Sequence, residues 1–328
     1  MSIALGLLSA CCVATAAACA AAPAPAGPGH SAAGEQVGVE IENCGNSWTL
    51  PGPPESVVVT KNTTPFTLAQ LGVLNKVTAK AGVFPQEYYP AEVNAQLAAI
   101  PTLSDKLDGG GHLQISRESI LEKDPDLVTG FSDTINDRTL AAAGIPVVDE
   151  PSLCGSAARP STFEDVYSHV DFYAQIFEVE DTAARVNEKL RQRVQAQVAH
   201  PAGGNRSVAV LYPSPGGTTV YAYGGYSMSA ALTSAAGLRD VFENEHKRVF
   251  EVSAEELIAS EPEVIVAAYS EGSPEQAVER VHAMAGARNI PAIGENRVIP
   301  MLLNRLDPPT PLAVDGLEEL NGELAVRS

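Results

Sequence analysis

The chain has 328 residues, 45% of them hydrophobic, which is enough for two domains of ordinary size with a core each. It carries 21 basic and 40 acidic residues, for a formal net charge of −19. This charge argues against nucleic acid or an anionic membrane surface as a general partner, although a few basic side chains in a cleft could still hold an anionic ligand.

An uncharged, mostly apolar segment at residues 2–22 leads into a spacer rich in Pro, Gly and Ala. We interpret residues 1–19 as an export signal and 20–36 as a flexible spacer, in preference to a permanent transmembrane helix. Cys11 and Cys19 both follow small residues, as in the lipoprotein box of bacteria. Cys19 stands where the apolar run ends and is the expected lipidation site, although Leu-Ser-Ala before Cys11 is the better box. The alternative is an uncleaved or soluble chain with incidental cysteines.

Two further cysteines, Cys44 and Cys154, lie beyond this segment. Export to an oxidising compartment favours a disulfide between them. Such a bridge would close a loop of about 110 residues and stabilise the fold by up to ~4–5 kcal/mol in the chain-entropy model. Two buried free thiols are the alternative, and cysteines this far apart make a poor metal site.

The first half, residues 37–161, alternates short apolar runs with helical patterns and is expected to form one lobe. Residues 37–50 alternate around an Asn-Cys-Gly-Asn turn, which predicts a β-hairpin. The sequence then predicts strands at 57–59, 76–79, 126–130 and 145–148, and helices at 63–74, 116–123 and 139–143. Because strands alternate with helices, we expect them to pair in parallel.

A helical linker is predicted over residues 162–200, with a helix at 162–177 followed by a long one at 179–198. Apolar residues recur at steps of three and four along the long helix, at Val179, Ala183, Val186, Leu190, Val194 and Val198. Acidic residues at its start suit the helix dipole, and Pro201 ends it. We expect this helix to join two similar halves; the alternative is an ordinary amphipathic helix inside one domain.

The second half, residues 205–328, repeats a pattern of the first. The segment ISRESILEKDPDLVTG at 115–130 and the segment VSAEELIASEPEVIVAA at 252–268 share a capping Ser, a Glu two residues later and an acidic-Pro-acidic step into a strand. Further strands are predicted at 207–212, 220–223 and 297–300, and helices at 227–236, 274–284 and 312–325. The expected fold class is therefore α/β, with two Rossmann-like lobes of mainly parallel sheets joined by a single long helix.

These two segments, with VYAYGGYSMSAALTSAAGLRDVF and the closing IPAIGENRVI, follow one another in an order similar to that of a known family. Over about residues 44–325 the chain resembles the helical-backbone (class III) periplasmic-binding proteins, the receptor class for ferric siderophores, cobalamin and haem. It is most similar to the iron–siderophore substrate-binding lipoproteins of ABC transporters in Gram-positive bacteria, actinobacteria included.

The resemblance implies a solute receptor and not an enzyme. Such a receptor is a monomer without a resident cofactor, anchored by lipid on the extracellular face of the cell membrane. It binds a ferric siderophore between its lobes, with the iron held by the chelator, and delivers it to an ABC permease and its ATPase. In this family a Glu on each lobe docks on the permease, and the matching residues are Glu118 and Glu255. Alternatively, each Glu merely suits its helix dipole or completes a cap.

Candidate ligand-binding residues come from the loops that follow predicted strands. Lys and Arg can pair with the oxygens of a ferric siderophore, and Tyr can pack flat while it donates a hydrogen bond. The candidates are Lys61, Tyr88, Tyr89, Phe131, Arg138, Tyr212, Tyr223, Tyr226, Tyr269 and Arg305, with Asn62, Ser132 and Arg248 beside them.

Other functions fit the sequence less well. Haem stays an alternative because Tyr88, Tyr89 or His112 could ligate it, and cobalamin is another ligand of the same class. A manganese or zinc receptor is disfavoured because the six His are scattered, and a secreted hydrolase because no Gly-x-Ser-x-Gly motif occurs. A cell-surface interaction protein that uses the same fold also stays open.

Overall fold

A computed structural model of the chain describes residues 38–108, 112–155, 157–214, 217 and 219–327. The predicted export signal and the two cysteines at its end, Cys11 and Cys19, lie outside the described residues. The structure below belongs to one unit of the chain, Val37–Ser328. Within the described residues, no helix is both long enough and apolar enough to cross a bilayer.

The predicted hairpin is present as the antiparallel strands β1 (Val39–Asn43) and β2 (Asn46–Leu50). Its two-residue turn places Cys44 and Gly45 at φ values of +51° and +80°, the left-handed geometry that matches strand twist in a tight hairpin. Cys44 forms a disulfide with Cys154 across a sequence separation of 110 residues, which confirms the predicted pairing.

The sheet of the N-terminal lobe has the order β5-β4-β3-β6-β7, and all its neighbours pair in parallel, as expected. Its central strands are short β-branched runs that are buried on both faces, as parallel strands between helices must be. The strands are β3 (Val57–Val59), β4 (Val77–Ala81), β5 (Thr102–Ser104), β6 (Leu127–Thr129) and β7 (Val147–Val148). The helices are α1 (Thr64–Gln70), α2 (Ala91–Ala99), α3 (Arg117–Leu121) and α4 (Asp137–Leu140).

Two of these elements, α2 and β5, were not predicted from the sequence. α2 buries only Val93 and Leu97, and β5 buries none of its residues, so neither shows a clear apolar period. Instead, Lys80 holds α2 in place: its ammonium donates hydrogen bonds to the carbonyls of Leu97 and Ile100, at 2.7 and 2.5 Å. A cation at a helix C-terminus is favourable because it meets the negative end of the dipole.

The sheet of the C-terminal lobe has the order β11-β9-β8-β12-β13, with β10 pairing in parallel with β8. β8, β12 and β13 are parallel, whereas β9 is antiparallel to both β8 and β11. The strands are β8 (Ser207–Pro213), β9 (Val220–Tyr223), β10 (Arg239–Asp240), β11 (Val249–Glu251), β12 (Val264–Tyr269) and β13 (Val298–Leu302). The helices are α7 (Met228–Ala235), α8 (Ala254–Ala259), α9 (Pro274–His282), α10 (Pro291–Gly294) and α11 (Pro311–Val326). The connection between β8 and β9 is too short for a parallel crossover, which explains their antiparallel pairing.

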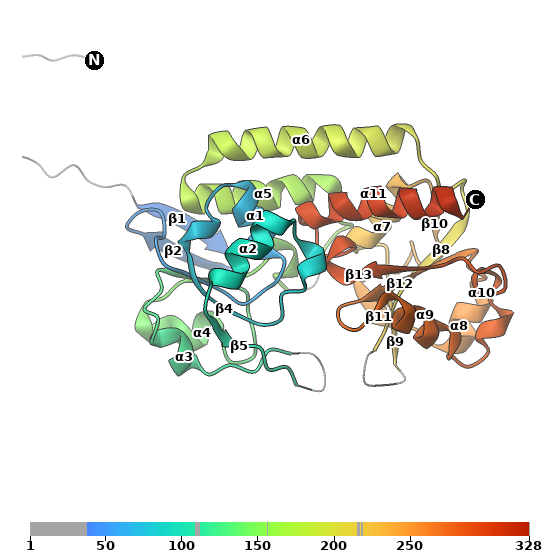
Figure 1. Ribbon diagram of the computed structural model, residues 1–328, viewed down its shortest axis with the longest axis horizontal. Coiled ribbons are helices and arrows are strands. Elements are labelled where there is room, and N and C mark those ends of the chain that lie inside the picture. Colours follow the sequence, from blue (N-terminus) through green and yellow to red (C-terminus); the bar gives the residue numbers. More distant parts are fainter. Residues whose placement is uncertain (1–37, 109–111, 156, 215–216, 218, 328) are drawn as a thin grey trace, which may run out of the picture. The chain divides into compact units, whose positions relative to one another are not determined.

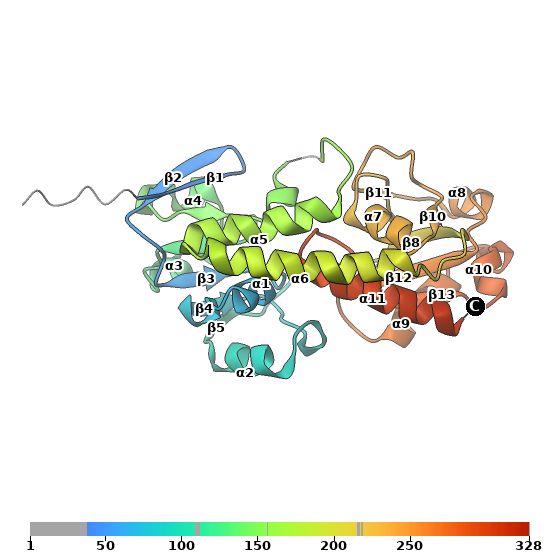
Figure 2. The ribbon, with the colours of Figure 1, turned by 90° about the horizontal axis from the view of Figure 1, so that it is seen from above.

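The linker consists of α5 (Phe163–Phe177) and α6 (Glu180–Ala199). Figures 1 and 2 show α6 alongside α5 near its start and alongside α11 near its end. The predicted apolar stripe holds in the middle of the helix and fails at its end, where Val198 is 50% exposed. There Gln197 faces α11 and accepts a hydrogen bond of 3.0 Å from the amide of Asn321.

Polar contacts fix α6 to α5 within the linker and to α11 of the C-terminal lobe. The buried amide of Asn187 donates to the carbonyl of Tyr167 and to a carboxylate oxygen of Asp171 on α5, at 3.1 and 2.8 Å. On the other side, Arg193 donates to Asp315 at 2.6 Å and to Glu318 at 2.8 Å on α11. One hydrophobic cluster includes residues of both sheets and of these three helices. The lobes therefore share a continuous core along α5, α6 and α11 in addition to the chain connection.

The packing of α11 on the turn before it gives a test of this shared core. A Cβ added at Gly316 would lie 1.7 Å from the carbonyl oxygen of Arg305, whereas one at Gly322 would meet nothing within 4 Å. Gly316→Ala should therefore lower the free energy of unfolding by ~1–3 kcal/mol or more, since neither helix nor turn can yield cheaply. Gly322→Ala on the same helix should raise it by up to ~1 kcal/mol. Urea unfolding of both variants measures the difference, and equal effects would contradict the packing.

Candidate functional site

The carboxyl ends of the strands of the two lobes carry most of the predicted ligand residues. Lys61 follows β3 and Phe131 follows β6, while Tyr212 and Tyr269 lie at the ends of β8 and β12. In open α/β sheets this edge is where ligands bind, because loops of variable sequence meet there on a rigid frame. The structure thus brings residues from distant parts of the chain to one region.

Four phenols meet where the lobes join, Tyr88 from the N-terminal lobe and Tyr212, Tyr223 and Tyr269 from the C-terminal lobe. We call them the tyrosine cluster. Tyr88 and Tyr223 are almost fully buried, at 2% and 5% exposure. Burial raises the pKa of both phenols well above the usual value, and neighbouring tyrosines of the cluster add to the rise. The phenols are therefore neutral at physiological pH and act as hydrogen-bond donors and apolar faces.

Hydrogen bonds cross between the lobes at this cluster. The backbone N–H of Asn304 donates to the hydroxyl of Tyr88 at 3.2 Å, and its side-chain amide donates to the amide oxygen of Asn62 at 2.6 Å. The guanidinium of Arg305 donates to the carbonyl of Glu87 at 2.7 Å. Two of the predicted ligand residues, Tyr88 and Arg305, thus take part in joining the lobes.

Each arginine near the cluster has its own carboxylate partner. Arg305 pairs with Glu319 of α11, and Arg248 pairs with Asp307, whose side chain is fully buried. Asp307 also accepts the N–H of Met228 at the start of α7, at 2.9 Å. Burial raises the pKa of Asp307, while the Arg248 charge works in the opposite direction. A buried carboxylate with a guanidinium and an N–H donor has the partners that such a charge requires.

In the N-terminal lobe, the charge of Lys61 acts on Asp149, which follows β7, although the described residues show no ion pair between the two. Burial raises the pKa of Asp149, and the Lys61 charge works to lower it. The stem of Lys61 crosses Gly130, where an added Cβ would lie 2.4 Å from the lysine Cγ and 2.5 Å from the hydroxyl of Thr60. Gly130 also has a φ of +97°, so this position requires glycine on both counts.

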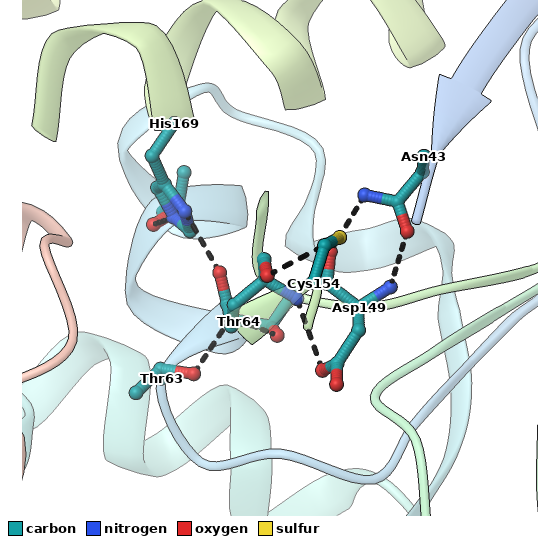
Figure 3. A network of polar contacts seen from close by, with 8 residues as sticks. Asn43, Thr63, Thr64, Asp149, Cys154 and His169 are labelled. Carbon is teal, nitrogen blue, oxygen red and sulfur yellow. Dashed lines mark hydrogen bonds and ion pairs between the residues drawn. The ribbon is translucent and has the colours of Figure 1, made fainter. Parts of the chain in front are cut away.

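A buried polar network fixes the ends of these N-terminal strands (Figure 3). Glu150 accepts hydrogen bonds from the hydroxyls of Thr63 and Thr64 at 2.7 and 3.1 Å, and it pairs with His169 Nδ1 at 2.8 Å. His169 Nε2 lies 2.8 Å from the hydroxyl of Thr67. Burial acts to raise the pKa of Glu150, but His169 and the hydroxyls outweigh it and hold this pKa below the usual value. The network therefore ties β7, α1 and α5 together through an ionised carboxylate.

The side chain of Asn43 extends this network to the hairpin. Its amide donates to the carbonyl of Asp149, and its amide oxygen accepts the N–H of the same residue, both at 2.9 Å. The disulfide at Cys44 is the next residue, so the hairpin, the disulfide and the end of β7 form one connected unit. Sequence analysis missed Asn43, Asp149, Glu150 and His169, because single polar residues whose partners are far away leave no local pattern.

The remaining predicted ligand residues lie in varied surroundings. Tyr89 is buried and donates to the carbonyl of Asn62, and Phe131 is half-buried against the core. Arg138 is exposed on α4 without an ion pair in the described part of the chain. Tyr226 stacks on His246, with ring centroids 5.2 Å apart, and its carbonyl accepts a hydrogen bond from Ser161 of the other lobe. The roles of these residues stay predictions.

Glu118 and Glu255 occupy equivalent places on the two lobes. Each lies in the first turn of a short helix, α3 or α8, behind a capping Ser, and each is exposed. Both helices lead to a residue in the left-handed region before the shared Pro, Asp124 at φ +46° and Glu261 at φ +45°. The pKa of Glu118 is lowered, mainly because its carboxylate accepts a hydrogen bond from the backbone N–H of the same residue. The similar sequences at 115–130 and 252–268 therefore have the same backbone conformation at this point.

Taken together, two α/β lobes meet with their strand ends facing a junction lined by phenols and by paired charges. Within the described residues, no three His, Cys, Asp or Glu side chains gather as metal ligands would. A family model described as periplasmic binding protein matches residues 57–301, so the chain belongs to that family. Its members bind substrates for transport and are not enzymes.

Solved structures agree with this assignment. An ABC-type Fe3+-hydroxamate transport system from Saccharomonospora viridis is 40% identical, with a TM-score of 0.82, over 87% of this chain and 98% of that chain. A periplasmic binding protein from Veillonella parvula is 21% identical, with a TM-score of 0.73, over 89% of this chain and 99% of that one. The periplasmic heme binding protein HutB of Vibrio cholerae is 18% identical, with a TM-score of 0.64, over 82% and 98%. The last two show the fold alone. A search of curated proteins found no match.

Proposed function

We propose that this protein is the extracytoplasmic solute receptor of an ABC importer and that it binds a ferric siderophore of the hydroxamate type at the junction of its lobes. The balance of charge around the tyrosine cluster is the observation that carries this assignment. The relative from Saccharomonospora viridis, which is described as an Fe3+-hydroxamate transport system, supports the same ligand class.

Each cation near the junction is offset by a carboxylate, and Glu87 and Glu275 add further negative charge near Tyr269. Arg248 faces Asp307, Arg305 faces Glu319, and Lys61 is offset by Asp149. Burial raises the pKa of Tyr88 and Tyr223, so these two phenols are neutral. A ferric ion with three singly charged hydroxamates is uncharged as well, whereas a ferric tris-catecholate carries three negative charges. Burying a charge without a counter-charge costs about several kcal/mol. A site whose cations are already matched by carboxylates therefore favours the uncharged hydroxamate complex over the trianionic catecholate complex.

The chemistry of the tyrosine cluster suits such a ligand. A ferric tris-hydroxamate presents oxygens around the metal and apolar linkers between the chelating groups. The hydroxyl of Tyr212 lies within hydrogen-bond distance of that of Ser270, at 2.8 Å, and the tyrosine rings offer flat apolar faces. Haem and cobalamin are the alternative ligands of the same fold, and a cell-surface interaction protein that binds none of them is the alternative function.

Calorimetric titration of the purified protein tests the ligand class. We expect an uncharged ferric tris-hydroxamate to bind with a Kd in or below the micromolar range (~−8 kcal/mol). A ferric tris-catecholate, ferric citrate, haem and cobalamin should each bind at least about tenfold more weakly (~1.4 kcal/mol). Tight binding of haem or cobalamin alone would replace the siderophore, and heat signals from none of the five compounds would favour the interaction protein.

We further propose that Glu118 and Glu255 dock on the permease of the importer. Both carboxylates are exposed and equivalent in the two lobes, so they suit basic sites on a partner with matching symmetry. A Glu in the first turn of a helix is also favourable because it meets the positive end of the helix dipole. Only an uptake measurement distinguishes this stabilising role from docking on the permease.

Replacing both Glu118 and Glu255 by Ala should abolish uptake of radiolabelled ferric siderophore in cells, because the permease loses both contacts. The affinity of the purified variant for the ligand should stay within about twofold (~0.4 kcal/mol) of the parent. The control replaces Glu122 and Glu256 by Ala, which are exposed acidic residues of the same two helical segments. Normal uptake by the Glu118/Glu255 variant, or an equal loss in the control, would contradict the docking role.

Lipid anchoring at Cys19 on the extracellular face of the cell membrane is the location that this function requires. It rests on the sequence, since the apolar segment ends at this residue and a small-residue box precedes it. Membrane fractionation after expression in an actinobacterial host should find the parent and Cys11→Ala in the membrane, and Cys19→Ala in the medium. The opposite outcome would assign the anchor to Cys11, and release of the parent protein would remove it.

A further inference from the structure

The disulfide between Cys44 and Cys154 borders a cavity of about 310 Å³. Residues from three parts of the chain contribute to its wall, among them Ser152, Cys154, Ala158 and Arg159 of the segment that follows β7, Ser168 of α5 and Pro309 of the turn before α11. Cys44 is not among the described residues of the wall. Both cysteines are half-buried, so the cavity, and not overall exposure, distinguishes the two sulfurs.

The charged groups of the cavity wall occur in pairs. Arg159 donates to both carboxylate oxygens of Asp165, with Nη1 at 3.0 Å. His169 pairs through Nδ1 with Glu150, at 2.8 Å. The attacking species in thiol–disulfide exchange is a thiolate, which an unpaired carboxylate would repel. Because Arg159 neutralises the one carboxylate among the described residues of the wall, an approaching thiolate meets no uncompensated negative charge there.

The other sulfur, that of Cys44, stays close to the lobe when the bond is open. Cys44 lies in the turn of the hairpin, and the preceding residue, Asn43, forms two hydrogen bonds of 2.9 Å with the backbone of Asp149. These bonds do not involve the disulfide, so they keep the Cys44 thiolate near Cys154. A bond opened by a monothiol therefore recloses readily, because the returning thiolate belongs to the same molecule. Lasting opening requires a reductant with two thiols.

From this geometry we propose that Cys154 is the exchange site of the disulfide, at which an external thiolate enters the cavity and attacks, with Cys44 as the leaving group. The inference goes beyond the receptor function proposed above and does not depend on the ligand. Exchange in the opposite direction, which forms the bond after export, passes through the same mixed disulfide on Cys154.

The step balances with a dithiol as the reductant. Its first thiolate forms a bond to Cys154 Sγ while the bond between the two cysteine sulfurs breaks, and the electron pair of the broken bond goes to Cys44, which takes up a proton. The second thiolate of the reductant then attacks the first sulfur, closes the disulfide of the reductant and releases Cys154, which also takes up a proton. Two electrons and two protons thus pass from the dithiol to the cystine.

The opened form keeps non-covalent contacts between the hairpin and its lobe. The thiol of Cys154 has an acceptor in the carbonyl oxygen of Glu150, 3.9 Å from its sulfur (Figure 3). Gln175 of α5 donates to the carbonyl of Glu40 at 3.1 Å, and Ile41 is buried in the core that the hairpin shares with the lobe. Exchange at Cys154 therefore converts a covalent attachment of the hairpin into a non-covalent one without removing the hairpin from the lobe.

Mapping of the mixed disulfide tests the proposal directly. The native protein is treated with excess reduced glutathione, quenched with acid at short times, digested without reduction and analysed by mass spectrometry. We expect glutathione on Cys154 to exceed glutathione on Cys44 by about tenfold or more, because only the cavity admits the attacking thiolate. In denaturing urea the cavity is absent, and the two sulfurs should carry similar amounts.

A pair of tryptophan variants tests the route through the cavity. Ala158 and Ala184 are both exposed, but only Ala158 belongs to the cavity wall, whereas Ala184 lies on α6. Ala158→Trp should slow reduction of the native disulfide by dithiothreitol by about fivefold or more, while Ala184→Trp should leave the rate within about twofold of the parent. Alkylation of the freed thiols, followed by mass spectrometry, measures the rate constants.

Each outcome decides the matter. Equal amounts of the two adducts in the native protein, or an excess on Cys44, overturn the assignment of Cys154. Equal rates in Ala158→Trp and Ala184→Trp overturn access through the cavity. A disulfide that reacts in urea but at neither sulfur in the native protein overturns the exchange site altogether. None of these results affects the receptor function, which is tested by ligand binding.

Discussion

The arrangement of the junction depends on the apolar cluster that runs along α5, α6 and α11 and includes residues of both sheets. Strand ends of two separate sheets have no reason to meet unless something else sets their distance. Here the shared core sets it, and the bonds from Asn304 to Tyr88 and Asn62 complete it. A closely packed core cannot deform continuously. We therefore expect the two lobes to make only small movements relative to each other about the shared cluster.

Charge is handled in the same manner throughout this region. Arg248 and Arg305 near the junction are matched by the buried Asp307 and the partly buried Glu319, and Glu150 and His169 form a second buried pair in the N-terminal lobe. Such pairs add little to stability on balance, since desolvation offsets much of their attraction. Their effect here is to fix geometry: a carboxylate with several donors holds three elements of the chain in one arrangement, as Glu150 does for β7, α1 and α5.

Much of the fold could be predicted because its signals are local. The buried run Val57–Val59 and the echo between 115–130 and 252–268 each need only a short window of sequence, and both correspond to what is observed. In the N-terminal lobe, the missed elements α2 and β5 bury too little to leave a period, and in the C-terminal lobe β10, β11 and α10, which have two to four residues each, were also missed. At the site, the candidate residue types at strand ends could be named, but their partners could not. Tyr88 meets a residue 216 positions away, and Arg248 pairs with Asp307 59 positions away. Local sequence carries no trace of such pairs.

The hairpin has a practical consequence for the study of this molecule. The chain contains a single tryptophan, Trp48, which lies on β2 opposite Ile41, on the hairpin that carries the disulfide. Tyrosine emission sums over nine residues, of which only four form the tyrosine cluster. Tryptophan emission, in contrast, comes from the hairpin alone, and it therefore reports on the oxidation state and attachment of the hairpin without any added label.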